Sequence, residues 1–295
     1  MSLQFIENDG GKLAVETRGP ANAPLVVCSP GLGDTRDAYY NVADQLVAAG
    51  YRVALVDLRG QGDASTGFRS YGDSETASDL IKVVETLAPG GGRAVLAGGS
   101  MSGGAATIAA GQRPDLVAGV VLLGAFLRNG SAGAVLRFIM YLLFLRPWGP
   151  SMWKMYATTL WPGLGPDGAK ARAARSTRLL TRKADPASSG STESRWAAFQ
   201  SLMGTIDHDK DVAPWLPKVK TQPALVVVGD KDPDWSQPVE EAAWVASQFA
   251  AGATTTLVVE GVGHAPQYEK PDVVGPEMVR FLNGLRQGDS FKMSV

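Results

Sequence analysis

Residues 93–106 constrain the fold of this chain more than any other segment. A short apolar run (residues 94–97) passes through glycines and two serines into a run of small residues. A strand that turns sharply into a helix places the side chain of the turn residue clear of the sheet, beside the unpaired N–H groups of the helix start. This is the layout of a nucleophile elbow, where a serine attacks a carbonyl carbon and backbone N–H groups hold the oxyanion.

Two serines in this turn are candidate nucleophiles. Gly98 and Ser100 fit the pattern Gly-x-Ser-x-Gly, but Ser102 occupies the position of the closing glycine. A second register, Ser-x-Ser-x-Gly ending at Gly104, would make Ser102 the nucleophile. We favour Ser100 because it follows the strand at the usual distance. The alternative without chemistry is a turn in which glycine supplies a positive φ.

A serine nucleophile needs a base, normally histidine, and this chain has only two histidines. His264 follows a strand-like run (residues 255–259) and precedes a helix-like segment, so it can reach a neighbouring turn. Asp232 lies just beyond another apolar run (residues 224–228). Because ligands of open parallel sheets bind at the carboxyl ends of the strands, we predict a triad of Ser100, His264 and Asp232.

We expect other roles for the remaining titratable groups of the chain near these positions and for the second histidine. Asp230 and Asp234 also follow the apolar run and are weaker candidates for the acid, and we expect them in solvated turns. His208 is crowded by acidic residues at positions 207, 209 and 211, and we expect it at the surface or at a hinge. The predicted mechanism needs no metal ion and no organic cofactor.

Short apolar or β-branched runs alternate with helix-like segments along most of the chain. The runs cover residues 25–28, 52–56, 94–97, 117–123, 224–228 and 255–259, and the helix-like segments include residues 76–87, residues 240–249 and a final helix whose regular part starts at Pro276. Two more strands (residues 4–7 and 12–17) flank an Asn-Asp-Gly-Gly turn, which is a strong hairpin signal. Strands that are apolar on both faces predict an α/β fold, with a mostly parallel sheet covered by helices on both sides.

The alternation stops between residues 127 and 205. No strand-like run appears there, over a length far beyond an ordinary connection of about 2–6 residues. We therefore predict a helical lid at residues 127–205, inserted into an α/β core of residues 1–126 and 206–295. Four of the seven tryptophans lie in this segment and give it an apolar face, which packs onto the core and roofs the pocket. We interpret residues 184–194 as a flexible loop.

Two further motifs complete a resemblance to a known fold family. Ser29-Pro-Gly-Leu-Gly-Asp is similar to a His-Gly-x-Gly oxyanion loop, with Pro30 in the place of histidine. Asp57-Leu-Arg-Gly-Gln-Gly-Asp-Ala-Ser is similar to an Asp-x-Arg-Gly-x-Gly-x-Ser stretch, with its serine one place late at Ser65. Together with the elbow and the serine–acid–histidine order, they make the chain resemble the α/β-hydrolase fold superfamily in its lidded, serine esterase-like form.

The resemblance implies one fold over nearly the whole chain and a set of site residues. It assigns the oxyanion N–H groups to Leu32 and to Met101, the residue after the nucleophile. We also expect substrate contacts from both parts of the chain, namely from Gly31, Phe126, Trp148, Trp153 and Tyr156. The expected substrate is a small hydrophobic molecule.

The predicted reaction is hydrolysis of an ester or a related acyl bond through an acyl-enzyme. Ser100 attacks the carbonyl, His264 moves the proton and Asp232 holds the imidazole. Two other classes stay open at this point. One is a non-hydrolytic acyltransferase, cyclase or lyase of secondary metabolism on the same scaffold, and the other is a ligand-binding receptor with vestigial turnover.

The composition argues against several other classes. The formal net charge is −1, so no overall field favours nucleic acid. A single cysteine, Cys28, excludes an internal disulfide and a multi-cysteine metal site. The longest apolar run of the middle segment (residues 138–145) is too short for a membrane span, which needs about 20 residues. With no signal peptide visible, we expect a cytoplasmic protein, and the sequence does not indicate its oligomeric state.

A basic segment stands out in the predicted lid. Basic residues far outnumber acidic ones across residues 127–205, whereas the rest of the chain is acidic. Six of them crowd one helix-like stretch: Lys170, Arg172, Arg175, Arg178, Arg182 and Lys183. They could attract an acidic substrate, an anionic lipid surface or an acyl carrier. We favour a solvated helix face that leans on the acidic body.

Overall fold

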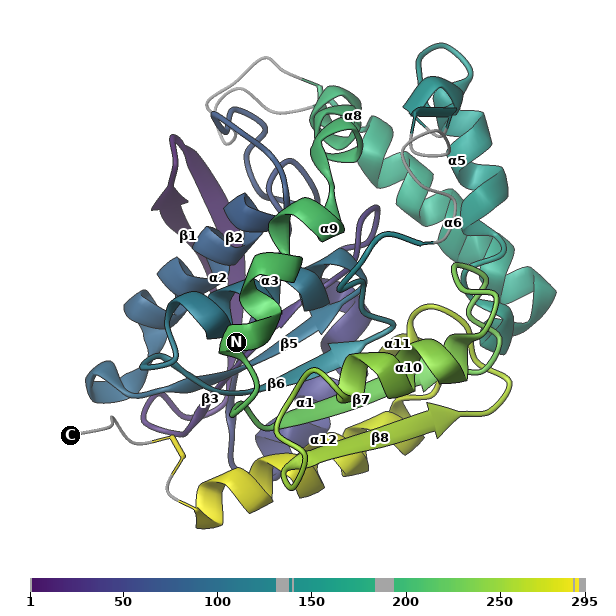
Figure 1. The fold of residues 1–295 in the computed structure, drawn as a ribbon. Coiled ribbons are helices and arrows are strands. Elements are labelled where there is room, and N and C mark those ends of the chain that lie inside the picture. The colour runs from purple at the N-terminus through teal and green to yellow at the C-terminus, as the bar shows by residue number, and fades with distance from the viewer. Residues whose placement is uncertain (1, 131–137, 140, 184–193, 289, 292–295) are drawn as a thin grey trace.

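An eight-stranded sheet forms the centre of the protein, in the order β1-β2-β4-β3-β5-β6-β7-β8. The computed structural model describes residues 2–130, 138, 139, 141–183, 194–288, 290 and 291, and Figure 1 shows their arrangement. β1 (Ser2–Asn8) and β2 (Gly11–Arg18) form the predicted hairpin, and β2 pairs antiparallel with β4. All the other strand pairs are parallel, which confirms the predicted mostly parallel sheet.

The parallel strands match the apolar runs of the sequence. They are β3 (Leu25–Ser29), β4 (Arg52–Val56), β5 (Ala94–Gly99), β6 (Val117–Leu123), β7 (Ala224–Gly229) and β8 (Thr254–Val259). Every residue of β3, β5, β6 and β7 is buried, whereas β8 lies at the edge of the sheet and is partly exposed. A strand that is covered on both faces has no solvent side to carry polar residues, so its sequence is unbroken and apolar.

Helices cover both faces of this sheet and enclose two apolar layers. α2 (Asp73–Leu87), α3 (Met101–Gln112) and α10 (Pro238–Ala246) contribute to one layer. α1 (Tyr40–Ala48) and α12 (Pro271–Gln287) pack against each other in the opposite layer. Shorter helices complete the core: η1 (Arg36–Tyr39), η2 (Pro89–Gly91), η4 (Ala213–Lys218) and α11 (Pro266–Glu269).

The final helix begins earlier than the sequence pattern predicts. α12 starts at Pro271, where proline suits the first turn because it needs no N–H there. Pro276 lies inside the helix and removes one backbone bond. Val274 and Met278, on either side of it, are both fully buried. Their packing outweighs the single lost bond, so the prediction that the regular helix starts at Pro276 is wrong.

Between β6 and β7, the part of the chain that the structure describes forms helices and no strand. Besides η4, they include α5 (Gly149–Ala157), η3 (Pro162–Leu164), α6 (Gly165–Thr181), α8 (Arg195–Thr205) and α9 (His208–Asp211). We call the described residues from 138 to 205 the helical insert, and Figure 1 shows α5, α6 and α8 grouped together on one side of the sheet. Its own apolar cluster includes Trp153, Trp196 and Phe199.

The loop predicted at residues 184–194 lies outside the described residues, apart from Ser194, whose side chain accepts the N–H of Ala197 and caps α8. Among the helices that the structure describes, none is long and apolar enough to cross a membrane.

The basic segment of α6 binds the acidic body of the protein. Arg172 donates hydrogen bonds to Asp34 and, at 2.8 Å, to Asp37, and its guanidinium lies 4.0 Å from the centre of the Tyr268 ring. Arg175 pairs with Asp37 at 3.1 Å. The helix therefore leans on the body as expected, but Arg172 is buried rather than solvated, because two carboxylates and an aromatic ring enclose its charge.

We expect Arg172→Met to lower the free energy of unfolding by about 3–5 kcal/mol. The substitution removes one partner of a buried ion pair and leaves the Asp34 carboxylate uncompensated. The matched control on the same helix is Arg178→Met, an exposed position where the change should stay within about 0.5 kcal/mol. Chemical denaturation of both variants measures the difference. Equal stability of the two variants would contradict a structural role for the Arg172 pairs.

Candidate active site

The turn between β5 and α3 holds Ser100 in a strained conformation. Its φ of 55° is in the left-handed region, which residues with a Cβ atom rarely adopt. Backbone bonds fix this turn, because the Ser100 N–H donates to the Leu123 carbonyl at 2.9 Å and the Phe126 N–H donates to the Ser100 carbonyl at 3.2 Å. Gly98 is required, since a Cβ there would lie 2.2 Å from the carbonyl oxygen of Ser102.

Ser102, the alternative nucleophile, faces a different environment. It is fully buried, and its hydroxyl donates to the Pro30 carbonyl at 2.6 Å. The Ser29 hydroxyl lies 3.0 Å from the Ser102 hydroxyl oxygen. Ser102 thus ties the loop after β3 to the start of α3, and it is not among the residues that line the cavity beside Ser100. The geometry favours the register with Ser100 as nucleophile.

Two carboxylates orient the imidazole of His264. Its Nδ1 lies 2.9 Å from Oδ2 of Asp232 and 3.3 Å from Oδ2 of Asp234. Burial disfavours the charged imidazole, but the two carboxylates outweigh burial and raise the pKa of His264 to about 10. With Nδ1 held by Asp232, Nε2 is the nitrogen that can exchange a proton with a reacting group.

Asp234 does not lie in a solvated turn, so that prediction is wrong. Its side chain is 12% exposed, and it accepts a hydrogen bond from the hydroxyl of Tyr156 in the helical insert. Burial raises the pKa of Asp234. The sequence shows the short Asp-x-Asp spacing, but it cannot show that the turn folds inward under Tyr156.

Glu269, which the sequence analysis did not select, supports the histidine loop. Its carboxylate accepts the N–H groups of Gly263 at 3.1 Å and of Ala265 at 3.2 Å. It also accepts the N–H of Gly163 from the insert, at 2.7 Å. The carboxylate therefore holds two N–H groups of the histidine loop and one of the insert, and Glu269 does not line the cavity beside Ser100. Its only signal in the sequence is its place five residues after a candidate histidine.

The expected oxyanion donors lie on two sides of Ser100. Met101 is the first residue of α3, so its N–H has no carbonyl one turn earlier in the helix. Leu32 lies on the loop after β3 and lines the same cavity as Ser100. Gln61 supports this loop, because its Oε1 accepts the N–H of Gly33 at 2.7 Å. The Asp-x-Arg-Gly-x-Gly stretch therefore buttresses the loop rather than the nucleophile.

A cavity of about 140 Å³, which we call the serine cavity, lies beside Ser100. The residues that line it come from both the core and the insert: Leu32, Ser100, Met101, Phe126, Trp153, Tyr156, Leu160, Ile206, His208, Asp234 and His264. Three of the expected substrate contacts, Phe126, Trp153 and Tyr156, are therefore on its wall. The cavity is mostly apolar, with a few polar groups that converge on it, as small-molecule sites usually are.

The two remaining expected contacts, Gly31 and Trp148, are not among the residues that line the serine cavity. Gly31 packs directly against the nucleophile, because a Cβ at this position would lie 2.6 Å from Cβ of Ser100. Trp148 is half exposed, and its Nε1 donates to the Leu142 carbonyl at 3.2 Å.

His208 is buried and lines the serine cavity, so the surface position that we expected as one of two alternatives is wrong, and the hinge position stays a prediction. Its ring stacks on Phe126, with the ring centres 5.3 Å apart. Of the acidic neighbours that suggested solvent exposure, Asp207 caps the first turn of α9, whereas Asp209 is exposed. In a sequence, a carboxylate that caps a helix cannot be distinguished from one that is simply exposed, and this is why the acidic neighbours were misleading.

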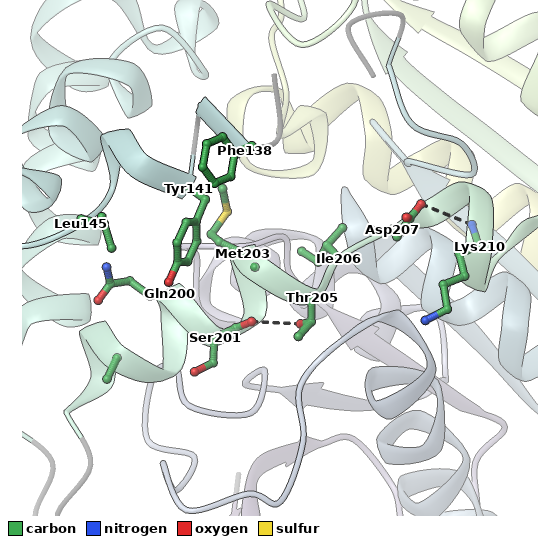
Figure 2. Close-up of a pocket in the computed structure, with 12 residues that line it drawn as sticks. Phe138, Tyr141, Leu145, Gln200, Ser201, Met203, Thr205, Ile206, Asp207 and Lys210 are labelled. Carbon is green, nitrogen blue, oxygen red and sulfur yellow. Dashed lines mark hydrogen bonds between the residues drawn. The ribbon is translucent and has the colours of Figure 1, made fainter. Parts of the chain in front are cut away.

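A larger hollow, which we call the outer groove, opens beside the serine cavity. It has a volume of about 830 Å³, and Figure 2 shows Phe138 and Tyr141 lying near Met203 and the end of α8. Ile206 lines both the outer groove and the serine cavity. The two spaces therefore share Ile206 as a wall residue.

Asp232, Asp234 and His264 also form a group that could hold a cation. One ligand atom from each lies within 4.8 Å of the others. The group is equally the acid–base pair of a serine triad, since Nδ1 of His264 is hydrogen-bonded to Asp232. The nearby strained serine explains the His264–Asp232 pair without a further component, and Asp234 is a second carboxylate beside that pair.

Comparisons with known proteins agree with this architecture. A curated epoxide hydrolase from Caballeronia sordidicola is 27% identical over 94% of this chain and 92% of its own length. A solved esterase from Exiguobacterium antarcticum superposes with a TM-score of 0.76 at 23% identity, over 95% of this chain and 98% of its own. The enol-lactonase from Burkholderia xenovorans LB400 superposes with a TM-score of 0.75 at 20% identity, over 95% of this chain and 100% of its own. Residues 26–276 match the family that is described as the alpha/beta hydrolase family, and the chain belongs to that family.

Proposed function

We propose that this protein is a serine hydrolase that cleaves an ester or a related acyl bond of a small hydrophobic substrate. One observation carries the proposal. Ser100 occupies a strained elbow and shares a cavity with His264, whose Nδ1 lies 2.9 Å from Asp232. The solved esterases and the enol-lactonase that share the fold act, by their names, on the same kind of bond.

The proposed reaction runs through an acyl-enzyme. Ser100 attacks the carbonyl carbon while Nε2 of His264 accepts its proton and then delivers it to the leaving group. Asp232 holds the imidazole and stabilises its charged form. The N–H groups of Leu32 and Met101 stabilise the tetrahedral oxyanion, an effect worth about 3–4 kcal/mol per donor. Water then attacks the acyl-enzyme, with His264 as the base.

The epoxide hydrolase relative raises a second reaction, which the residue at the elbow disfavours. A carboxylate that opens an epoxide forms an ester, and water can hydrolyse that ester to free the enzyme. A serine that opens an epoxide would form an ether, which has no carbonyl for water to attack. The elbow of this chain carries Ser100 and no aspartate, so acyl chemistry is the better match.

We further propose that residues 127–205 act as a lid on a core of residues 1–126 and 206–295. Trp153, Tyr156 and Leu160 of the insert line the serine cavity, so the segment roofs the nucleophile. Their apolar surface supports a hydrophobic substrate. Acyl transfer and hydrolysis share the first half of this mechanism and differ in whether water or another nucleophile receives the acyl group.

Labelling with a fluorophosphonate, followed by peptide mapping, tests the proposal together with a panel of esters, thioesters and epoxides. We expect a stoichiometric adduct on Ser100 and turnover of at least one ester or thioester. Product analysis with and without an added alcohol separates hydrolysis from acyl transfer. An adduct on Ser102, or epoxide opening without ester cleavage, would overturn the assignment.

The volume of the serine cavity predicts a short optimum in chain length. Each methylene that is buried contributes about 0.8 kcal/mol, so kcat/KM should rise about fourfold per added carbon until the cavity is full. Ile206→Ala opens the cavity toward the outer groove and should move the optimum to longer chains.

A series of straight-chain esters measures this response, with Ile206→Leu as the volume-matched control that should keep the original optimum. Salt should not change it, because burial of apolar surface is not screened by ions. A flat response to chain length, or the same optimum in Ile206→Ala, would contradict a hydrophobic acyl pocket that Ile206 closes.

A further inference from the structure

A second histidine–carboxylate pair includes His208, which lines the serine cavity. Nδ1 of His208 lies 2.9 Å from Oδ2 of Asp73, the first residue of α2. Asp73 is fully buried, and the His208 side chain is 8% exposed. Neither belongs to the triad, and the two lie more than a hundred positions apart in the sequence. The fold has brought an ionisable pair to the wall of the reaction cavity without giving it a step in hydrolysis.

The surroundings hold His208 in place. The side-chain oxygen of Asn129 accepts the backbone N–H of His208 at 3.1 Å, and the Asn129 side-chain amide donates to Asp207 at 2.8 Å. The His208 ring stacks on Phe126, whose ring centre lies 5.8 Å from that of His264. One aromatic ring therefore contacts both imidazoles. This packing fixes where His208 stands relative to the triad.

The pair is poorly satisfied within the protein itself. Among the described residues, the two Asp73 carboxylate oxygens and Nδ1 of His208 form no aligned hydrogen bond, although the ion-pair distance is short. Removing two ionisable groups from water costs several kcal/mol, and apolar side chains of similar size would avoid this cost. The short contact with Asp73 occupies the Nδ1 side of the ring, so Nε2 is the nitrogen that can bind a molecule in the cavity.

We propose that His208, oriented by Asp73, selects substrates that carry a hydroxyl group near the scissile bond. The inference rests on the proposed acyl hydrolysis, because the substrate's carbonyl must lie at Ser100. Nε2 accepts a hydrogen bond when the imidazole is neutral and donates one when it is charged. A hydroxyl is both donor and acceptor, so it satisfies Nε2 in either form. The rest of the cavity wall contacts the hydrocarbon part of the substrate.

The test compares matched substrates by their ratio of kcat/KM. The substrates are ethyl pentanoate and its 2-, 3- and 4-hydroxy derivatives, assayed by release of acid. With the natural enzyme, we expect one hydroxy ester to exceed ethyl pentanoate by about 3- to 10-fold, the range of one net hydrogen bond. The ratio does not depend on the fraction of enzyme that is folded and active.

Variants assign the preference to the pair. His208→Phe alone would leave Asp73 buried without its partner, so the main variant is Asp73→Asn combined with His208→Phe. We expect its ratio to fall to about one, and the ratio of Asp73→Asn alone to lie between one and the natural value. Lys210→Ala, an exposed position on the same helix, is the control that should keep the natural ratio. An unchanged ratio in the double variant would overturn the proposal.

Binding measurements separate this proposal from the proposed function. In Ser100→Ala protein, calorimetry with the same esters needs no turnover, and we expect the preferred hydroxy ester to bind about 3- to 10-fold tighter than ethyl pentanoate. Tighter binding without fluorophosphonate labelling of the natural enzyme would refute the hydrolase proposal alone. Labelling of Ser100 with no hydroxyl preference in binding or turnover would refute the role of His208 alone. Preference for a carboxylate-bearing ester that fades with salt would overturn the choice of a hydroxyl.

Discussion

Ser100→Ala should lower kcat for ester hydrolysis by about four to six orders of magnitude while the protein remains folded. The loss is this large because no acyl-enzyme can form without the nucleophile, and the remaining groups act as a unit with it. Alanine also relieves no steric conflict in the cavity, so substrate binding should persist. Steady-state ester assays measure the loss of kcat, and denaturation curves show whether the variant is folded.

Ser102→Ala is the matched control for this prediction. Its hydroxyl bonds the Pro30 carbonyl at 2.6 Å, so we expect a loss of about 1–3 kcal/mol of stability with turnover retained. Near-normal turnover of Ser100→Ala, or inactivation confined to Ser102→Ala, would show that the elbow is read in the wrong register.

The two carboxylates beside His264 should respond unequally to conversion into asparagine. Asp232→Asn should lower kcat by about 10⁴-fold, because an amide no longer fixes the imidazole tautomer or stabilises its charge. His264→Ala should be as damaging as loss of the serine. Asp234→Asn should retain most of kcat, because its oxygen lies farther from Nδ1, at 3.3 Å compared with 2.9 Å.

Asp234→Asn should instead shift the pH dependence. The carboxylates raise the pKa of His264 to about 10, and only the neutral imidazole can accept the serine proton. Activity should therefore rise as the pH rises toward that value. Removing the Asp234 charge lowers the pKa, so the rising limb of kcat/KM should move to lower pH.

The charged form of His264 also stabilises the fold, and this contribution has a defined pH window. It is fully present below the unfolded pKa of about 6.5 and is lost as the pH rises through the folded value. Profiles of kcat/KM and of unfolding free energy check both signs. An unshifted profile in Asp234→Asn, or a larger loss of kcat there than in Asp232→Asn, would exchange the roles assigned to the two residues.

The strands were predictable because their physics is local. β3, β5, β6 and β7 are buried on both faces, so each appears in the sequence as an unbroken apolar run. β5 ends directly before Ser100, and β7 ends shortly before Asp232. The start of α12 was not predictable from Pro276, because burial of Val274 decides it and burial is a property of the whole fold.

The polar residues of the cavity show a similar limit. Asp232 could be predicted from its place after β7. The burial of Asp234 could not be predicted, because it depends on Tyr156, which packs over it from a distant segment. His208 looked solvated because its neighbours are acidic, but its environment is set by Asp73 and Phe126, which are far from it in the sequence. A single sequence shows which groups are ionisable, and only the packing shows which of them face inward.

The attachments of the helical insert have a consequence for modularity. In α6, Arg172 donates a hydrogen bond to Asp34, and Ser176 donates one to the Gly33 carbonyl in the loop after β3. The Leu160 carbonyl accepts the backbone N–H of His264 at 2.8 Å. The insert therefore supplies part of the scaffold that holds the loop after β3 and the loop of His264. A chimera that exchanges the whole segment for that of another enzyme would lose these bonds and with them the alignment of both loops. Redesign of selectivity on this scaffold has to leave α6 and the 160–163 turn in place and vary only the remaining side chains that line the cavity.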